Sequence, residues 1–306
     1  MPRTLILWIV AGSAPFSIYI AGQTPAVPAG PTVSIPFFAS DTHDKAVSDV
    51  APADVEVLDN KKPPQSALGI RGPSELPLRL GVLIDRSGSE RTSEVYEVAA
   101  GGLLDFAGQL LSGADDKAFI GPFNDEGGGT VFVSKAQLRA VKVDLTPRGG
   151  TALYDELRYA YNQRMKKDDA QAYRRVIVLT SDGDDNASHI GREAAIATAE
   201  EAAVVIFAIS TSEGAFSTHH SVRGEDTLKR FAEQTGGLAF LQLNRKDLSK
   251  VFATIKEQID NMGVLSYVPA SPLQNGQRRT LELKSASNRK LKFRAPKAYY
   301  LNAATQ

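Results

Sequence analysis

The stretch that decides the fold is Leu78-Arg-Leu-Gly-Val-Leu-Ile-Asp-Arg-Ser-Gly-Ser89. Residues 78–84 form an apolar run that is typical of a strand buried on both faces of a sheet. Asp85 follows this run directly, and Ser87 and Ser89 come two and four residues later in a short glycine-containing loop. The stretch therefore predicts a buried strand that ends in a carboxylate and is followed by two hydroxyls.

Similar apolar runs alternate with helical segments on the C-terminal side of this stretch. Strands are expected at 117–123, 130–133, 175–180, 204–210 and 238–243. Helices are expected at 90–111, 152–166, 192–203, 225–235 and 246–262. Such alternation is typical of βαβ units, whose helices cover both faces of a parallel sheet. It predicts an α/β fold over residues 78–263, with a Rossmann-like, doubly wound and mostly parallel sheet.

The segments on either side of the α/β region have strand-like patterns. Residues 33–39 and 54–58 are rich in β-type residues, and strong turn residues follow the second of these runs. Near the other end, residues 264–268, 279–283 and 290–294 alternate between apolar and polar residues, as half-exposed antiparallel strands do. We expect the segments 30–77 and 264–306 to pair into a small flanking β-sandwich.

The composition excludes several kinds of function. Lysine and arginine together number 35, as do aspartate and glutamate, so the net charge is zero. A neutral chain without a long basic run has no general attraction for nucleic acid, and we expect no nucleic-acid partner. The chain has no cysteine, which excludes disulfides, thiolate catalysis and thiolate zinc sites.

Residues 1–29 have the pattern of a secretory signal peptide. Arg3 precedes an apolar core, and a polar, proline-rich segment follows it. We expect cleavage after Gly22 or Ala29, export to the periplasm or the medium, and no stable membrane span after cleavage. The alternative is an uncleaved anchor helix over residues 4–22, a segment barely long enough to span a bilayer.

Asp85 lies where open α/β sheets bind their ligands, in the crevice beyond the carboxyl ends of the strands. One carboxylate with the hydroxyls of Ser87 and Ser89 suits a hard divalent cation. Mg²⁺ is favoured over Mn²⁺ or Ca²⁺, because Mg²⁺ takes few carboxylates and keeps some of its water. Two further polar residues are expected at the same edge: Thr151 follows a Gly-Gly turn, and Asp182 follows another buried strand.

The order Asp-x-Ser-x-Ser, Gly-Gly-Thr and Ser-Asp-Gly resembles the metal-ion-dependent adhesion site of von Willebrand factor A domains. The resemblance implies that Ser87 and Ser89 bind the metal directly, and that Asp85 and Thr151 bind it directly or through water. Asp182 would act through water. The resemblance also implies one coordination position left open for an acidic side chain of a protein partner, and no hydrolysis. The whole chain resembles the bacterial proteins called VWFA-related, which are common in acidobacterial genomes.

These observations predict an exported, non-enzymatic binding or adhesion-type protein that recognises an exposed Asp or Glu of a protein ligand through its metal. One alternative is a structural or assembly subunit of the envelope, in which the metal only stabilises the fold. A metal-dependent hydrolase is a further alternative, but the sequence places no His or Glu as its general base.

Local alternatives exist for some of these residues. Ser89 is of the residue type, and in the position, of a helix N-cap before Glu90. Asp182, Asp184, Asn186 and Glu193 have the spacing of a calcium-binding loop, although alanine stands where that loop usually has glycine. Two charged neighbours are candidates for steering a partner. They are Arg86, which otherwise is expected to be solvated, and Asp184.

Overall fold

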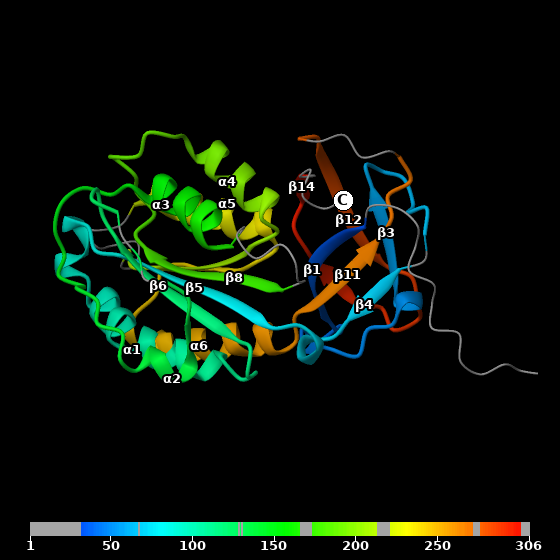
Figure 1. Ribbon diagram of the computed structural model, residues 1–306, viewed down its shortest axis with the longest axis horizontal. Helices are drawn as coiled ribbons and strands as arrows, with labels where there is room; N and C mark the ends of the chain where they lie inside the picture. The colour runs from blue at the N-terminus through cyan, green and yellow to red at the C-terminus, as the bar shows by residue number, and fades with distance from the viewer. Residues whose placement is uncertain are drawn as a thin grey trace, which may run out of the picture.

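The protein consists of an α/β lobe and a β-rich lobe that lie side by side (Figure 1). The structure is a computed structural model, and it describes residues 32–66, 68–127, 129, 131–165, 173–212, 221–271 and 276–300. The expected signal peptide, residues 1–29, lies outside these residues. Within the described ranges, no helix is long and apolar enough to cross a membrane.

A six-stranded sheet forms the centre of the α/β lobe, in the order β10-β9-β8-β5-β6-β7. Its strands are β5 (Leu78–Asp85), β6 (Lys117–Phe123), β7 (Val133–Ser134), β8 (Arg174–Ser181), β9 (Val205–Ser210) and β10 (Ala239–Phe240). Strand β5 pairs in parallel with β6 and β8, and only β7 is antiparallel to its neighbour. Every residue of β5 is buried, which confirms the strand predicted from its apolar run.

Helices cover both faces of this sheet (Figure 1). One face carries α1 (Glu94–Leu110), α2 (Lys135–Leu138) and α6 (Leu248–Asp260). The other carries α3 (Leu153–Ala160), α4 (Arg192–Glu201) and α5 (Val222–Thr235). Successive strand residues point to opposite faces, so Val82 of β5 packs in the first core and Leu83 in the second. The doubly wound α/β fold expected from the sequence is confirmed.

Several element ends differ from the prediction. The helix expected from Glu90 begins at Glu94, because a short 3₁₀ helix (Gly88–Thr92) precedes it and Ser93 caps it. The Ser93 hydroxyl accepts a hydrogen bond from the Tyr96 N–H at 3.0 Å. Ser89 is therefore not the cap of this helix. Ser221 likewise caps α5, which begins at Val222, three residues before the predicted start.

The remaining differences are at short or irregular elements. Helix α3 ends at Ala160 and continues as a π-helical turn (Tyr161–Met165), and the strand expected over 238–243 is reduced to β10. Short 3₁₀ helices lie at Pro52–Asp54, Pro73–Glu75 and Arg245–Asp247.

The β-rich lobe joins strands from the two ends of the chain. The N-terminal strands are β1 (Val33–Ser40), β2 (Ala46–Val47), β3 (Val55–Asp59) and β4 (Gly69–Arg71). The C-terminal strands are β11 (Gly263–Tyr267), β12 (Arg278–Ser285), β13 (Lys292–Arg294) and β14 (Ala298–Tyr300). Strand β1 pairs antiparallel with β11, and β3 pairs antiparallel with β12. Two curled sheets result, with one apolar core between them, as expected for the flanking β-sandwich.

A buried ion pair connects the two ends of the chain inside this lobe. The Arg279 guanidinium of β12 donates to Asp59 of β3 at 2.7 Å, and both side chains are almost fully buried. The Tyr299 hydroxyl of β14 donates to the other Asp59 oxygen, also at 2.7 Å. The Asp59 charge is thus balanced by a cation and two hydrogen bonds.

Arg279→Met should destabilise the protein by about 3–5 kcal/mol, because it leaves the Asp59 charge buried without a counter-charge. The matched control is Lys284→Met, which breaks an exposed pair with Glu282 on the same strand and should cost less than about 1 kcal/mol. Urea unfolding of both variants measures the two values. Equal losses would contradict the assignment of Arg279 as the counter-charge of Asp59.

Candidate functional site

The three predicted segments meet at the carboxyl edge of the sheet. The Gly88 N–H, in the loop after β5, donates to the Gly149 carbonyl at 3.0 Å. The Thr151 N–H donates to the Asn186 side chain at 2.8 Å, and the Thr151 carbonyl accepts from the N–H of Asn186 at 3.0 Å. These bonds join the Asp85 loop to the Gly-Gly-Thr turn, and that turn to the loop after β8.

Asp85 is the fully buried centre of this region. One of its carboxylate oxygens accepts from the Ser87 N–H at 2.9 Å, and the other accepts from the Ser181 hydroxyl at 2.6 Å. The hydroxyls of Ser87 and Ser89 lie 3.0 Å apart. Asp85 and the two predicted serine ligands are therefore assembled at one place, with the serine hydroxyls adjacent.

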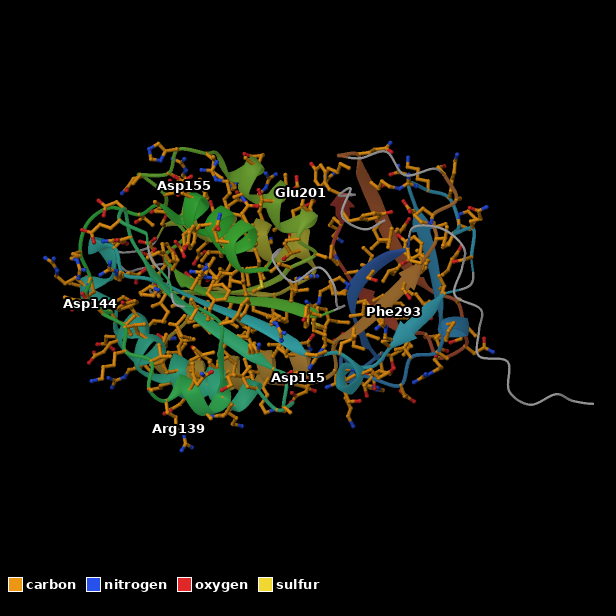
Figure 2. The ribbon with its side chains drawn as sticks, viewed as in Figure 1. Asp115, Arg139, Asp144, Asp155, Glu201 and Phe293 are labelled. Atoms are coloured by element: carbon orange, nitrogen blue, oxygen red, sulfur yellow. The ribbon has the colours of Figure 1, made fainter. Side chains whose placement is uncertain are left out.

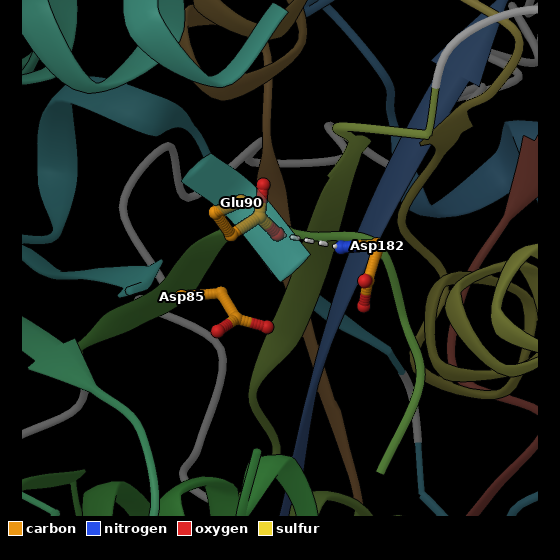
Figure 3. A group of neighbouring side chains, drawn as sticks. All are labelled: Asp85, Glu90 and Asp182. Atoms are coloured by element: carbon orange, nitrogen blue, oxygen red, sulfur yellow. Dashed lines mark hydrogen bonds between the residues drawn. The ribbon is translucent and has the colours of Figure 1, made fainter. Parts of the chain in front are cut away.

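Glu90 is a third acidic residue at this place, and the sequence analysis missed it. The carboxylates of Asp85, Glu90 and Asp182 each have an oxygen within 4.8 Å of the others. Figure 3 shows the side chains of Asp85, Glu90 and Asp182 as neighbours, with the hydrogen bond from the Asp182 N–H to Glu90 as a dashed line. Glu90 is only 2% exposed, and one of its oxygens accepts from the Asp182 N–H at 3.1 Å and from the Thr211 hydroxyl at 2.8 Å.

In the described part of the chain, these carboxylates have no side-chain counter-charge. No lysine, arginine or histidine in the described ranges forms an ion pair with Asp85, Glu90 or Asp182. Burial, with the nearby Asp182 charge, raises the pKa of Asp85 to about 7. Burial and the Asp85 charge raise the pKa of Glu90, and burial raises that of Asp182. Ionising all of them is costly unless a cation lies among them.

The donor set fits a hard divalent cation. It consists of carboxylate and hydroxyl oxygens, with no nitrogen or sulfur ligand. Thr151 is buried, and its backbone is fixed against the loop after β8. A cation among these groups would supply the positive charge that no described side chain provides, and it would leave Asp85, Ser87 and Ser89 in the roles that the resemblance implies.

Arg86 occupies a different environment from the one expected. Its side chain is 8% exposed and lies 3.4 Å from Asp144 and 3.5 Å from Glu126. Asp144 is at the end of the molecule opposite Phe293 of the β-rich lobe (Figure 2). The expectation of a solvated Arg86 is wrong, because two acidic side chains hold its guanidinium. The backbone of Arg86 shapes the loop, since its N–H donates to Phe123 and its carbonyl accepts from Arg148.

The loop after β8 does not form the alternative calcium site. The Asn186 side chain is bonded to Thr151, and Glu193 pairs with Arg192 and Arg230. Asp184, the second candidate for steering a partner, is partly buried and accepts from the Ser221 hydroxyl at 2.8 Å. These contacts fix the shape of the loop that presents Asp182.

A cavity of about 540 Å³ opens next to the site. Ala152, which follows Thr151, forms part of its wall. Asp125, Asp155 and His189 also line it. The hollow therefore lies next to the Gly-Gly-Thr turn, and neither Asp85, Glu90 nor Asp182 lines it.

No protein-family model matches the sequence, and neither does any curated protein. Among solved structures, the chain is similar to a von Willebrand factor type A protein from Catenulispora acidiphila, with a TM-score of 0.50 and 11% identity, covering 90% of this chain and 76% of that one. Proximal thread matrix protein 1 from the mussel byssus gives a TM-score of 0.48 and 16% identity, covering 77% of this chain and 51% of that one. BatB from Bacteroides thetaiotaomicron gives a TM-score of 0.43 and 16% identity, covering 60% of this chain and 97% of that one.

The Catenulispora structure shows the fold, which is that of a von Willebrand factor A domain with an additional β-rich lobe. This chain spans about half (51%) of the length of the mussel protein.

Glu90→Gln should raise the melting temperature of the metal-free protein in EDTA. Gln keeps the oxygen that accepts from Asp182 and Thr211 and removes one of the charges that repel each other. Because the folded-state pKa of Glu90 is raised, wild-type stability falls as the pH rises above the normal carboxyl range. The gain should therefore be larger at about pH 8 than at about pH 5.

The matched control for this comparison is Glu200→Gln. Glu200 is also buried, but it is paired with Arg278 at 2.7 Å. Its variant should lower the melting temperature. If both variants lower it at the higher pH, the carboxylates around Asp85 do not destabilise the metal-free fold.

Proposed function

We propose that this protein binds a protein ligand through a divalent cation held by Asp85, Ser87, Ser89, Thr151 and Asp182. The observation that carries the proposal is the group formed by the buried Asp85 and Glu90 with the half-buried Asp182, which no side-chain cation of the described residues pairs with and which lies beside the Ser87 and Ser89 hydroxyls. Such a group is stable only with protons or with a bound cation. Its position at the carboxyl edge of an open α/β sheet is where this class of fold binds ligands.

The partner would contribute an exposed Asp or Glu, which completes the coordination of the cation. The adjacent cavity offers room for further contacts with that partner. We propose no catalysis. The polar side chains around the carboxylates, such as Ser181 and Thr211, donate hydrogen bonds to them, and this role accounts for these side chains without a general base. The signal-like pattern of residues 1–29 supports a location outside the cytoplasm.

A structural role for the cation is the second candidate, and the burial of Glu90 favours it. In that case the cation would hold the loops after β5 and β8 together, and the partner would contact the protein elsewhere. The two candidates differ in the effect of removing the cation from a protein that stays folded. Partner binding is lost if the cation contacts the partner, and it persists if the cation is structural.

Thermal unfolding tests cation binding. We expect Mg²⁺, Mn²⁺ or Ca²⁺ to raise the melting temperature relative to EDTA, because a ligand that binds only the folded state stabilises it. A concentration of about 100 times Kd gives about 2.7 kcal/mol. The rise should disappear in Asp85→Asn and persist in Asp125→Asn, which changes an exposed carboxylate outside the group. No rise with any of the ions at millimolar concentration would refute the cation site.

Peptide binding tests the acidic partner. Peptide pools that contain Asp should be retained by the immobilised protein in the presence of the divalent cation and released by EDTA. The same pools with Asn in place of Asp should not be retained, because a neutral amide is a weaker ligand for the cation. Equal retention of both pools, or retention unaffected by Asp85→Asn, would favour the structural role.

A further inference from the structure

We propose that Glu90 is a direct ligand of the cation and that it makes this a three-carboxylate site that prefers Ca²⁺ to Mg²⁺. This inference rests on the proposed function, because it requires a cation at Asp85. It goes beyond the adhesion-site pattern of Asp85, Ser87, Ser89, Thr151 and Asp182, which does not include a residue at this position. It also reverses the preference for Mg²⁺ that the sequence favoured.

The placement of Glu90 is the first argument. Glu90 follows Ser89 within the 3₁₀ helix, and this turn directs its side chain into the protein toward Asp85 and Asp182. Two oxygens on opposite sides of one Ca²⁺ lie about 4.6–5.2 Å apart, since each Ca–O distance is about 2.3–2.6 Å. The three carboxylates lie within 4.8 Å of one another, so a single ion can contact all of them.

The second argument is the absence of another role for the Glu90 charge. A residue that is 2% exposed at this position would be most easily an apolar one. The hydrogen bonds from Asp182 and Thr211 orient one carboxylate oxygen, but they come from neutral donors and leave the net charge in place. Within the described residues no side-chain cation faces Glu90, so its burial is best explained by an ion.

The third argument is the ligand set that results. With Glu90, the site offers three carboxylates and the adjacent hydroxyls of Ser87 and Ser89, and the Thr151 hydroxyl would be the sixth ligand by the resemblance. Ca²⁺ takes about six to eight oxygen ligands and accepts several carboxylates in flexible geometry. Mg²⁺ requires a near-ideal octahedron and usually keeps several waters, with one or two carboxylates. Six protein oxygens, half of them from carboxylates, therefore favour Ca²⁺.

Isothermal titration calorimetry of the purified protein with CaCl₂ and with MgCl₂ tests this inference. The wild type should bind Ca²⁺ at least about tenfold more tightly than Mg²⁺, a difference of about 1.4 kcal/mol. Glu90→Gln should lose at least about tenfold in Ca²⁺ affinity and less in Mg²⁺ affinity. Glu200→Gln, a buried glutamate far from the site in the fold, should bind both ions as the wild type does. Circular dichroism checks that each variant is folded.

The outcomes separate this inference from the proposed function. If Asp85→Asn abolishes binding but Glu90→Gln binds both ions as tightly as the wild type, Glu90 is not a ligand and the proposed cation site stands. A wild type that binds Mg²⁺ more tightly than Ca²⁺ overturns the preference without the use of any variant, which covers the case of a variant that does not fold. A wild type that binds neither ion overturns both proposals.

Discussion

The hydrogen bond from the Ser181 hydroxyl to Asp85, 2.6 Å long, is the contact on which the site depends. Asp85 ends β5 and Ser181 ends β8, and these strands are parallel neighbours at the centre of the sheet. Parallel pairing brings their carboxyl ends to one edge, so residues almost a hundred positions apart meet there. Both side chains are fully buried, which fixes their geometry by packing as well as by hydrogen bonding. The loops that follow these strands therefore begin at residues whose positions are fixed.

The nearest arginine in the chain is kept out of the carboxylate group. Arg86 is the residue next to Asp85, and a guanidinium there would be the simplest counter-charge for it. Instead, the buried Arg86 guanidinium lies 3.4 Å from Asp144 and 3.5 Å from Glu126, while its backbone is bonded to neighbouring segments. Two acidic residues thus pair with Arg86, and no cation from the described part of the chain pairs with Asp85 or Glu90. Arg86 therefore does not offset the cost of ionising Asp85, whose pKa is raised by burial.

The sequence predicted those features that depend on periodicity and on strand ends. Long apolar runs identify β5, β8 and β9, and the position of Asp85 after such a run predicts its place at the sheet edge. Glu90 was missed because its charge is ordinary for the first turn of a helix, where acidic residues are common. Its burial depends on the 3₁₀ turn before Ser93, and that turn has no periodic pattern. The short strand β4 depends on pairing with β11, which is distant in the sequence. The short strand β2 depends on a specific register with β1.

The two lobes show two ways to bury an acidic residue. In the β-rich lobe, the Asp59 carboxylate is nearly inaccessible, and Arg279 and Tyr299 supply a charge and two hydrogen bonds within the protein. In the α/β lobe, Asp85 and Glu90 are equally buried, but their donors are hydroxyls and backbone N–H groups, which carry no charge. The β-rich lobe therefore neutralises its buried carboxylate with a side chain of the same chain. Among the described residues no such cation pairs with Asp85 or Glu90, and this difference between the two lobes is the physical basis of the proposed cation site.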